Sequence, residues 1–395
     1  MKVKSLKDLD VSGKKVLLRV DFNVPLENGK IMDDTRMTAA LPTIEHLLKS
    51  GAKIIVMSHL GRPEEEGKEG LKMDPIAKHL GELLKKPVKK LDACIGPDVQ
   101  KAVADMKAGD VIMLENTRFY DEEEQCDDNF CKELAALADL YVTDSFGTAH
   151  RKHATTYGIA KHLPAYAGLL MEKEITTLSE IMKDTEKPLA IIMGGSKIET
   201  KIGLIRNFLP RADYFLIGGG LANTFLAAEG FDVGASLYEK EKIPMAQEIM
   251  LAAESLKDRF LLPIDAVVAD QIGDNVPSLD LPLEDVEGDM KILDIGKRTV
   301  KLYTEVIKKA KTIIWNGPLG LFEKKAFAEG TAQMVRAIAN NKGAKTIIGG
   351  GDTIDSIKNL GISLDSFTHV STGGGAMLQF LEGTALPGVE IIMEK

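Results

Sequence analysis

Short apolar runs recur along the whole chain, and most of them end at glycine or at a polar residue. Short apolar runs are typical of strands that are buried on both faces of a parallel sheet. In the second half, five runs lead directly into glycine or an Asn-Gly step, at residues 188–195, 214–220, 312–317, 345–351 and 369–375. Open α/β sheets bind ligands at the carboxyl ends of their strands, and glycine lets backbone N–H groups approach an anion. The pattern therefore predicts phosphate-binding loops.

Strand candidates alternate with helical segments throughout the chain. In the first half the expected strands are residues 15–24, 52–59, 87–91, 110–114 and 140–143. In the second half they are residues 189–193, 214–217, 260–269, 312–315, 345–348 and 369–371. Helical spacing separates them, as at residues 38–49, where leucine and isoleucine recur every three or four positions. We therefore predict an α/β protein with two doubly wound, Rossmann-like parallel-sheet domains.

The expected domain boundary is a long amphipathic helix at residues 169–182, which a charged, proline-containing stretch follows. We predict an N-terminal domain at 1–168, a linker helix or hinge at 169–187, a C-terminal domain at 188–378 and a final segment at 379–395. Simple connection of the domains is the alternative to a hinge role for the helix. The final segment contains a short apolar strand pattern at 389–393.

Composition narrows the classes of partner. The 395 residues carry a formal net charge of -9, which argues against a general nucleic-acid or anionic-membrane surface. There is no apolar leader at the N-terminus, and no run reaches the roughly 18 apolar residues of a membrane span, so we expect a cytoplasmic protein. The three cysteines lack the spacing of a disulfide framework or a zinc site, and we expect them to be reduced.

The strand ends of the first half carry basic and polar side chains in place of glycine. These are Arg19, Asp21, Asn23, Arg36, His59, Arg62, Arg118, Arg151 and His153. Arginine binds phosphate and carboxylate bidentately, so a shared position at strand ends predicts one site for a small polyanion. For any single arginine, a surface ion pair is the competing interpretation.

Other charged groups have weaker interpretations. A metal pair formed by His150 and His153 is disfavoured, because no cysteine or carboxylate lies at ligand spacing. The acidic runs at 64–69 and 121–128 are interpreted as solvated loops outside the site. Neither G-x-x-x-x-G-K-[ST] nor G-x-G-x-x-G occurs, which argues against a P-loop protein and against a dinucleotide oxidoreductase.

Nine segments resemble, in order, the signature blocks of the phosphoglycerate kinase family. They are RVDFNVPL (19–26), SHLGRP (58–63), LENTRF (114–119), FGTAHRKH (146–153), GGSKIETKI (194–202), LPIDAVVAD (262–270), WNGPLGLFE (315–323), GGGDT (349–353) and STGGGAMLQFLEG (371–383). A single block could occur by chance in an unrelated α/β protein. Nine in order over nearly the whole chain leave little room for coincidence.

The resemblance implies a phosphotransferase with a carboxyl group as acceptor. It would transfer a phosphoryl group between 1,3-bisphosphoglycerate and Mg-ADP, giving 3-phosphoglycerate and Mg-ATP in glycolysis, as a monomer whose two domains close before reaction. The resemblance also implies that the final segment returns to the N-terminal domain. The alternative is a catalytically altered nucleotide- or phosphate-binding protein on the same fold.

Site residues follow from the matching positions. The resemblance implies substrate binding by Asp21, Phe22, Asn23, Arg36, His59, Leu60, Gly61, Arg62, Arg118, Arg151 and His153. It implies catalytic roles for Arg36, Lys197, Lys201, Gly373 and Gly374. It implies nucleotide binding by Lys201, Asn316, Glu323, Gly350, Gly351, Asp352 and Thr353, with Asp352 also holding Mg²⁺.

The chain departs from the family pattern at a few positions. Ser196 stands where alanine is usual and Thr200 where aspartate is usual, while both lysines of that block remain. Ile292 stands where a glycine commonly lies near the nucleotide base. We expect the reaction to be unaffected and the base preference to be open to change.

Overall fold

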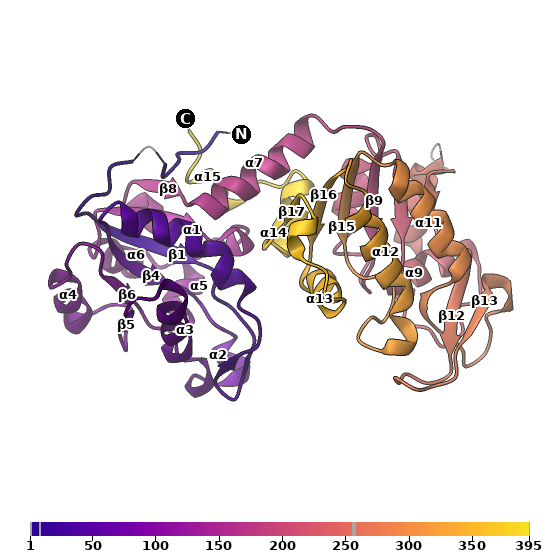
Figure 1. Ribbon diagram of the computed structural model, residues 1–395, viewed down its shortest axis with the longest axis horizontal. Helices are drawn as coiled ribbons and strands as arrows, with labels where there is room; N and C mark the ends of the chain where they lie inside the picture. The colour runs from indigo at the N-terminus through magenta and orange to yellow at the C-terminus, as the bar shows by residue number, and fades with distance from the viewer. Residues whose placement is uncertain (1, 8, 255–257, 395) are drawn as a thin grey trace. The chain divides into compact units, whose positions relative to one another are not determined.

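The computed structural model describes residues 2–7, 9–254 and 258–394 (Figure 1). The chain forms two compact units. Unit 1 comprises Met1–Ser179 and Thr384–Lys395, and unit 2 comprises Glu180–Gly383. Each unit contains a six-stranded sheet in which every strand pair is parallel, which confirms the predicted fold class. The predicted domain limits, with a separate hinge helix, stay a prediction.

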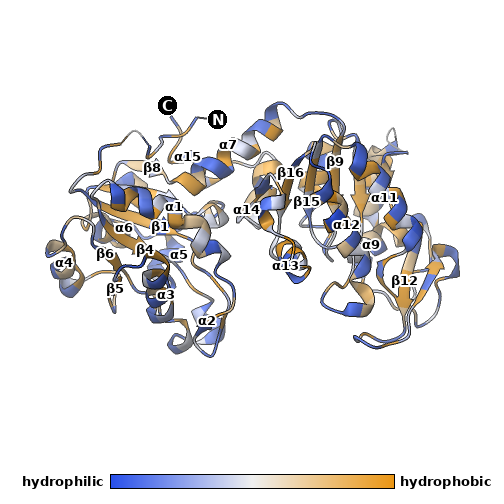
Figure 2. Cartoon of the chain, viewed as in Figure 1, coloured by the Kyte–Doolittle hydropathy of each residue, from blue (hydrophilic) through white to orange (hydrophobic). Residues whose placement is uncertain are grey.

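The sheet of unit 1 has the strand order β5-β6-β4-β1-β7-β8. In that order the strands are β5 (Lys89–Lys90), β6 (Val111–Met113), β4 (Lys53–Met57), β1 (Lys15–Val20), β7 (Leu140–Asp144) and β8 (Ala165–Ala167). The central strands are buried along almost their whole length because helices cover both faces. Figure 2 shows these strands as apolar, with hydrophilic residues on the surrounding helices.

Helices and short connections complete unit 1. The α-helices are α1 (Thr35–Lys49), α2 (Pro63–Glu66), α3 (Asp74–Leu84), α4 (Pro97–Ala104), α5 (Asp121–Gln125), α6 (Asp128–Ala135), α7 (Leu169–Lys183), which continues into unit 2, and α15 (Pro387–Glu390). The 3₁₀ turns are η1 (Glu69–Leu71), η2 (Thr117–Phe119), η3 (Phe146–Thr148) and η4 (Gly158–Lys161). A hairpin of β2 (Leu26–Glu27) and β3 (Lys30–Ile31) precedes α1.

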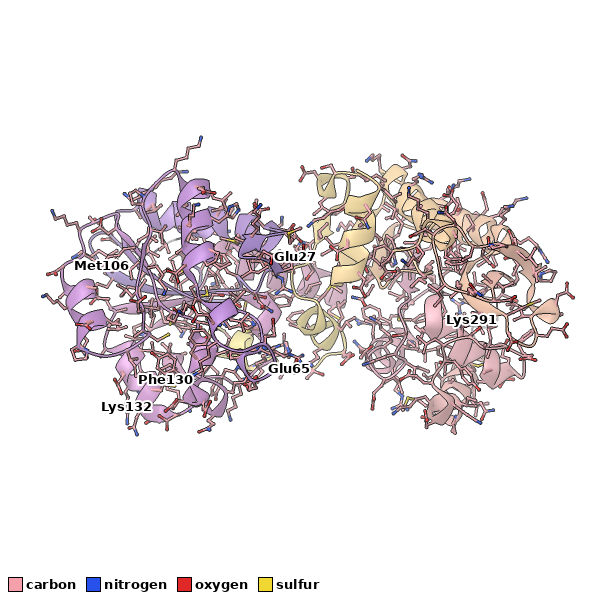
Figure 3. All side chains as sticks on the ribbon, turned by 90° about the horizontal axis from the view of Figure 1, so that it is seen from below. Glu27, Glu65, Met106, Phe130, Lys132 and Lys291 are labelled. Carbon is pink, nitrogen blue, oxygen red and sulfur yellow. The ribbon has the colours of Figure 1, made fainter. Side chains whose placement is uncertain are left out.

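Helix α6 illustrates how local sequence sets these elements. The Asp127 carboxylate accepts a hydrogen bond of 2.9 Å from the Phe130 amide and caps the helix. Phe130 is buried and stacks on Tyr120, with 5.1 Å between ring centroids, whereas Lys132 on the same helix is exposed (Figure 3). One apolar stripe therefore fixes the helix against the unit.

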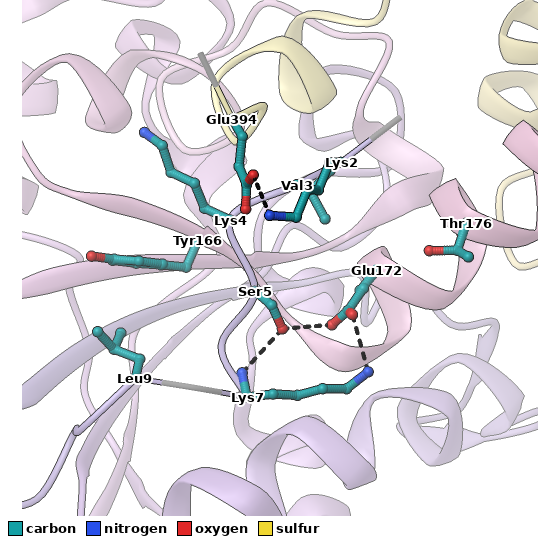
Figure 4. Close-up of a pocket in the computed structure, with 10 residues that line it drawn as sticks. All are labelled: Lys2, Val3, Lys4, Ser5, Lys7, Leu9, Tyr166, Glu172, Thr176 and Glu394. Atoms are coloured by element: carbon teal, nitrogen blue, oxygen red, sulfur yellow. Dashed lines mark hydrogen bonds and ion pairs between the residues drawn. The ribbon is translucent and has the colours of Figure 1, made fainter.

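The C-terminal segment pairs with the N-terminal one inside unit 1. The Lys4 amide donates to the Ile392 carbonyl at 2.8 Å, and Val3 forms a β-bridge with Met393. Lys2 Nζ lies 2.7 Å from Glu394 Oε2 beside a cavity of about 540 Å³ (Figure 4). The strand expected at 389–393 is wrong: residues 387–390 form α15, because Pro387 suits the first turn of a helix.

The sheet of unit 2 has the strand order β11-β10-β9-β15-β16-β17. In that order the strands are β11 (Phe260–Leu261), β10 (Tyr214–Ile217), β9 (Leu189–Met193), β15 (Thr312–Asn316), β16 (Lys345–Gly349) and β17 (His369–Val370). The α-helices are α8 (Ile202–Phe208), α9 (Gly219–Glu229), α10 (Ile243–Ala252), α11 (Lys297–Lys309), α12 (Glu329–Asn340), α13 (Gly351–Asn359) and α14 (Gly375–Leu381). The 3₁₀ turns include η5 (Lys240–Lys242), η7 (Leu283–Asp285), η8 (Lys325–Phe327) and η9 (Leu364–Ser366).

The strand expected at 260–269 is two strands in different sheets. β11 belongs to the main sheet, whereas β12 (Asp265–Ala269) is the centre of an antiparallel sheet with β13 (Leu279–Pro282) and β14 (Lys291–Ile295). Pro263 lies between the two strands and has no N–H for a sheet ladder, so the apolar run cannot continue as one strand. This small sheet has its own apolar cluster, which includes Ala266 and Val268.

Within the described part of the chain, no helix combines the length and the hydrophobicity needed to cross a membrane.

Candidate active site

In unit 1, Arg36 and Asp21 meet at the carboxyl end of β1. Arg36 lies in the first turn of α1, and its Nη1 donates to Asp21 Oδ2 at 2.9 Å. The Asp21 side chain is only 10% exposed, whereas that of Arg36 is 40% exposed. Asp21 therefore orients the guanidinium and leaves its other N–H groups available for an anion.

His59, two residues after the end of β4, is buried beside Arg19. Arg19 Nη2 lies 3.1 Å from His59 Nδ1, and because a guanidinium can only donate, Nδ1 must accept and the ring proton resides on Nε2. Burial, then the charges of Arg19 and Arg118, hold the pKa of His59 well below its usual value. His59 is thus a neutral donor. Arg19 itself, one of the basic strand-end residues expected from the sequence, is 2% exposed and part of this cluster.

Arg118 and Asn23 hold the loop after β4. Arg118 Nη1 donates to the Gly61 carbonyl at 2.7 Å, and the Gly61 amide donates to Asn23 Oδ1 at 2.8 Å. Gly61 has a φ of +58°, and a Cβ there would lie 2.4 Å from Leu71 Cδ2, so only glycine fits. Asn116 fixes the same loop, with its Oδ1 accepting from the Leu60 amide at 3.1 Å.

Two of the predicted substrate-binding side chains are in the core. Phe22 is 0% and Leu60 1% exposed. The Phe22 amide donates to Ser58 Oγ at 2.9 Å, and the Leu60 amide is bonded to Asn116. These two residues shape the loops, and their side chains do not reach the surface of the site.

Arg151 and His153 extend the cationic cluster after η3. Burial and the charges of Arg151 and Arg118 lower the pKa of His153 to about 4. Burial and the charge of Arg118 also lower the pKa of Arg151. The positive charge around His153 and Arg151 makes this part of unit 1 favourable for an anion.

Arg62 differs from the other arginines. Its side chain is 64% exposed, and its Nη1 pairs with Glu65 Oε1 at 2.8 Å. The Arg62 amide donates to Glu66 Oε1, also at 2.8 Å. For this residue the competing interpretation, a surface ion pair, describes the structure.

The acidic runs are solvated for the most part, as expected, but they are not simply loops. Residues 63–66 and 121–125 form helices α2 and α5, and both contact candidate site residues. Glu124 Oε1 lies 3.3 Å from Arg118 Nε. Glu123 is 1% exposed and accepts from the amide and hydroxyl of Thr155, at 2.9 and 2.5 Å. The sequence of an acidic run does not indicate which of its carboxylates is buried, because burial depends on a partner in the tertiary structure.

In unit 2, glycine loops after β9 and β15 pack backbone against backbone. The Gly195 amide donates to the Pro318 carbonyl at 2.9 Å. A Cβ on Gly194 would lie 1.9 Å from that carbonyl oxygen, so any side chain there would separate the loops. Glycine is therefore required at position 194 for close approach of the two loops.

Lys201 and Asn316 lie at the floor of this region. Lys201 is 7% exposed, and its Nζ donates to Asn316 Oδ1. Burial lowers the pKa of Lys201 to about 8, although the negative charges of Asp352 and Glu382 oppose that shift. The ammonium is thus held in a desolvated place where an anion would favour its charged form.

Two cavities meet at Gly195, Ser196 and Asp352. One, of about 310 Å³, is lined by Lys197, Thr200, Lys201, Asn316, Gly317, Gly350, Gly351, Thr353, Gly374 and Gly375 among others. The other, of about 320 Å³, is mostly apolar and is lined by Leu237, Pro263, Ile272, Ile292, Leu319 and Glu323 among others. A polar, glycine-lined cavity that continues into an apolar one matches the phosphates and base of a nucleotide.

Helix α13 begins at this junction. Gly350 precedes it with a φ of +96°, and Thr353 Oγ1 accepts from the Gly317 amide at 2.7 Å. Asp352 in its first turn is exposed and lines both cavities. A single carboxylate beside a phosphate cavity suits Mg²⁺, which takes one or two protein carboxylates together with nucleotide phosphates.

The structure separates two of the predicted glycines. Gly374, with a φ of +49°, lines the phosphate cavity beside Gly375. The Gly373 amide instead donates to Ser371 Oγ at 3.0 Å. Lys197 is exposed and lines the cavity near the start of the loop.

Comparison with known proteins agrees with this geometry. The family model of phosphoglycerate kinase matches residues 6–384. The chain belongs to the phosphoglycerate kinase family. The phosphoglycerate kinase of Dictyoglomus turgidum is 52% identical over 390 residues, which cover 99% of this chain and 98% of that protein. That of Moorella thermoacetica is 49% identical, with 99% of each chain covered.

Solved structures of the family share the fold. Phosphoglycerate kinase from Coxiella burnetii matches with a TM-score of 0.87 and 37% identity over 99% of each chain. That from Pyrococcus horikoshii matches with the same TM-score and 35% identity over 98% of each chain. Family membership confirms the resemblance seen in the sequence and the enzyme class: the chain is a kinase of glycolysis that uses a nucleotide.

Proposed function

We propose that the chain transfers a phosphoryl group reversibly between 1,3-bisphosphoglycerate and Mg-ADP, giving 3-phosphoglycerate and Mg-ATP. The observation that carries the proposal is that one chain holds two chemically different anion sites. Unit 1 has clustered arginines around the neutral His59. Unit 2 has a glycine-lined cavity with a buried lysine that continues into an apolar cavity.

The triose phosphate would bind in unit 1. Its anionic groups suit the residues Asp21, Asn23, Arg36, His59, Arg118, Arg151 and His153, with the loop backbone of residues 22 and 60–61 setting the shape and Arg62 at the exposed edge. Arg36 is the group best suited to the transferring phosphoryl, because Asp21 leaves part of its guanidinium open. A cationic site with neutral imidazoles binds an anion without needing a change of protonation near pH 7.

The nucleotide would bind in unit 2. Its phosphates suit the cavity of Lys197, Lys201, Asn316, Gly350, Gly351, Thr353 and Gly374, and its base suits the apolar cavity, with Glu323 at the ribose. Asp352 would hold Mg²⁺, which would supply positive charge against the nucleotide phosphates. Gly373 would contribute through the position of the loop before α14.

The reaction needs no general base. The leaving group of an acyl phosphate is a carboxylate, and the attacking oxygen of ADP is already ionised near pH 7. Catalysis is then alignment of the two anions and stabilisation of charge on the equatorial oxygens, by Arg36, Lys197, Lys201 and backbone N–H groups. In-line transfer also requires water to be excluded, so the proposal includes a closed state of the two units.

The test is steady-state turnover with Mg-ATP and 3-phosphoglycerate, read through a coupled reductive assay, beside a magnesium-free control. We expect turnover that requires magnesium. A folded protein that binds nucleotide without turnover would favour the alternative, a catalytically altered binding protein. A cytoplasmic monomer is part of the proposal, which light scattering after size exclusion and cell fractionation would check.

A further inference from the structure

A buried carboxylate on α5 holds the segment that carries Arg151 and His153. Glu123 is 1% exposed, and its two side-chain oxygens accept from the Thr155 amide at 2.9 Å and from the Thr155 hydroxyl at 2.5 Å. The backbone carbonyl of Glu123 accepts from the Ala154 amide at 2.8 Å. Three hydrogen bonds to one residue therefore attach this segment to α5.

The attachment continues from Thr155 to the two basic residues through Thr156. Thr156 Oγ1 donates to the Arg151 carbonyl at 2.8 Å and accepts from the His153 amide at 3.2 Å. The Thr155 carbonyl accepts from the hydroxyl of Tyr141, a buried residue of β7, at 2.7 Å. The backbone from Arg151 to Thr156 is therefore fixed both by the sheet and by α5.

Glu123 also places a negative charge near the cationic residues of unit 1. Burial raises the pKa of Glu123, whereas the charge of Arg19 and the hydrogen bonds from Thr155 oppose that shift. The charge of Arg118 acts in the same direction as that of Arg19. By Coulomb attraction alone, removal of this carboxylate would make the region more favourable for an anion. A favourable role of Glu123 in anion binding must therefore come from the position of the attached segment.

We propose that Glu123 is a positioning residue for the triose phosphate, because it holds residues 151–156 where Arg151 and His153 reach the bound anion. The inference rests on the proposed substrate site of unit 1. Glu123 is buried and acts through the segment that it fixes. Release of that segment should weaken 3-phosphoglycerate binding about tenfold to hundredfold, since a small displacement of a charged binding group is costly. Nucleotide binding in unit 2 should not change.

The first experiment neutralises two carboxylates of α5 separately. Glu123→Gln keeps the side-chain shape, but its NH₂ group cannot accept from Thr155, so the Kd and KM for 3-phosphoglycerate should rise at least about tenfold. Glu122→Gln is the matched control, because it removes the same charge from an exposed position of the same helix. The Kd of this control should stay within about twofold of the unaltered protein. Calorimetric titration and steady-state kinetics measure both variants, and the KM for ATP should be unchanged in each.

The sign of the effect separates positioning from electrostatics. Tighter or unchanged binding of 3-phosphoglycerate in Glu123→Gln would overturn the inference and leave the proposed function intact. An equal rise in the KM values for 3-phosphoglycerate and ATP would also overturn it, since that result indicates a general loss of structure. Unaltered protein that neither binds 3-phosphoglycerate nor turns it over would instead overturn the proposed function, and the inference with it.

A second pair of variants decides the question if Glu123→Gln does not fold. Thr155→Val replaces the hydroxyl by a methyl group of similar size and keeps the backbone amide, so 3-phosphoglycerate binding should weaken about threefold to tenfold. Thr155→Ser keeps the hydroxyl and should bind within about twofold of the unaltered protein. Equal affinities of Thr155→Val and Thr155→Ser would overturn the role of the attachment to Glu123.

Discussion

The two proposed anion sites are built in opposite ways. Unit 1 uses long cationic side chains at its strand ends, with Arg36 held by Asp21 and Arg118 held by the Gly61 carbonyl. Unit 2 uses the absence of side chains, as at Gly194, where a Cβ would lie 1.9 Å from a backbone oxygen. The first design depends on the chemistry of each residue, and the second depends on how closely two backbones approach.

The electrostatic consequences also differ. In unit 1 the arginines lie together, so the pKa values of His59, His153 and Arg151 are all lowered by burial and by neighbouring positive charge. In unit 2 burial alone lowers the pKa of Lys201, and nearby carboxylates oppose the shift. The candidate site of unit 1 thus gathers several positive charges, whereas the buried lysine of the candidate site in unit 2 lies near carboxylates.

The largest expected effect is on Arg36. Arg36→Ala should lower kcat by about 10³-fold with a much smaller change in ADP affinity, because an arginine that meets transition-state charge contributes on that order. Steady-state kinetics and calorimetric titration with ADP measure the two quantities. Arg62→Ala is the matched control in unit 1, since its side chain is exposed and paired with Glu65, and it should lose far less. A near-normal kcat in Arg36→Ala would remove Arg36 from the catalytic role.

The comparison predicts a steric effect in unit 2. Gly194→Ala should lower the free energy of unfolding by about 1–3 kcal/mol and weaken ADP binding, because the methyl group forces two loops apart. Gly351→Ala is the control: a Cβ there meets nothing within 4 Å, so stability should stay within about 1 kcal/mol. Chemical denaturation measures both. Equal losses would show that the close approach at residue 194 is not what requires glycine.

A smaller effect is expected on the pH dependence of ligand binding, which should differ between the two units. The pKa of Lys201 is about 8, so the ammonium loses its proton above that pH and ADP affinity should fall about tenfold between pH 8 and pH 9.5. Binding near pH 8 should take up a fraction of a proton, because the bound phosphates favour the charged form. Titrations in buffers of different ionisation enthalpy measure this uptake. Affinity for 3-phosphoglycerate should stay constant from pH 6.5 to 8, since the pKa of His153 is about 4 and that of His59 lies well below its usual value. ADP affinity that is independent of pH in this range would contradict the assignment.

The smallest effect is expected where the chain departs from its family. Ser196 and Thr200 line the phosphate cavity, and Thr200 Oγ1 donates to the Lys197 carbonyl at 3.0 Å. Ser196→Ala and Thr200→Asp should each change kcat by less than about threefold, because surface substitutions that leave both lysines in place remove little transition-state stabilisation. Steady-state kinetics of the two variants would show whether either residue does more than line the phosphate cavity.

The sequence predicted the parallel sheets well because their signal is local. Strands such as β1 and β15 are continuous apolar runs, and each ends where glycine or a polar residue begins. The sequence-based prediction was wrong at residues 260–269, where one apolar run contributes strands to two sheets. No local feature of the sequence indicates which partner strand each half will have. The prediction was also wrong at 389–393, where a helix turn and a β-bridge to Val3 replace the expected strand.

Prediction of the candidate site from the sequence has the same limit. Family blocks and arginine chemistry led to Arg36, Arg118 and Lys201, which lie in the connections that follow strands or at the starts of helices. Glu123 and Asn116 were not expected, because only their partners in the fold, Thr155 and the loop at Leu60, make a buried polar group stable there.

The sequence by itself determined the fold class and the family, and it indicated the residue types of the proposed anion sites, because periodicity, glycine and arginine act locally. Tertiary structure decided which charged groups are buried, and therefore which pKa values shift, as for Lys201 and His59. It also decided which buried carboxylate receives hydrogen-bond donors, as for Glu123. Burial and hydrogen-bond satisfaction depend on residues far away in the chain, so no local pattern can encode them.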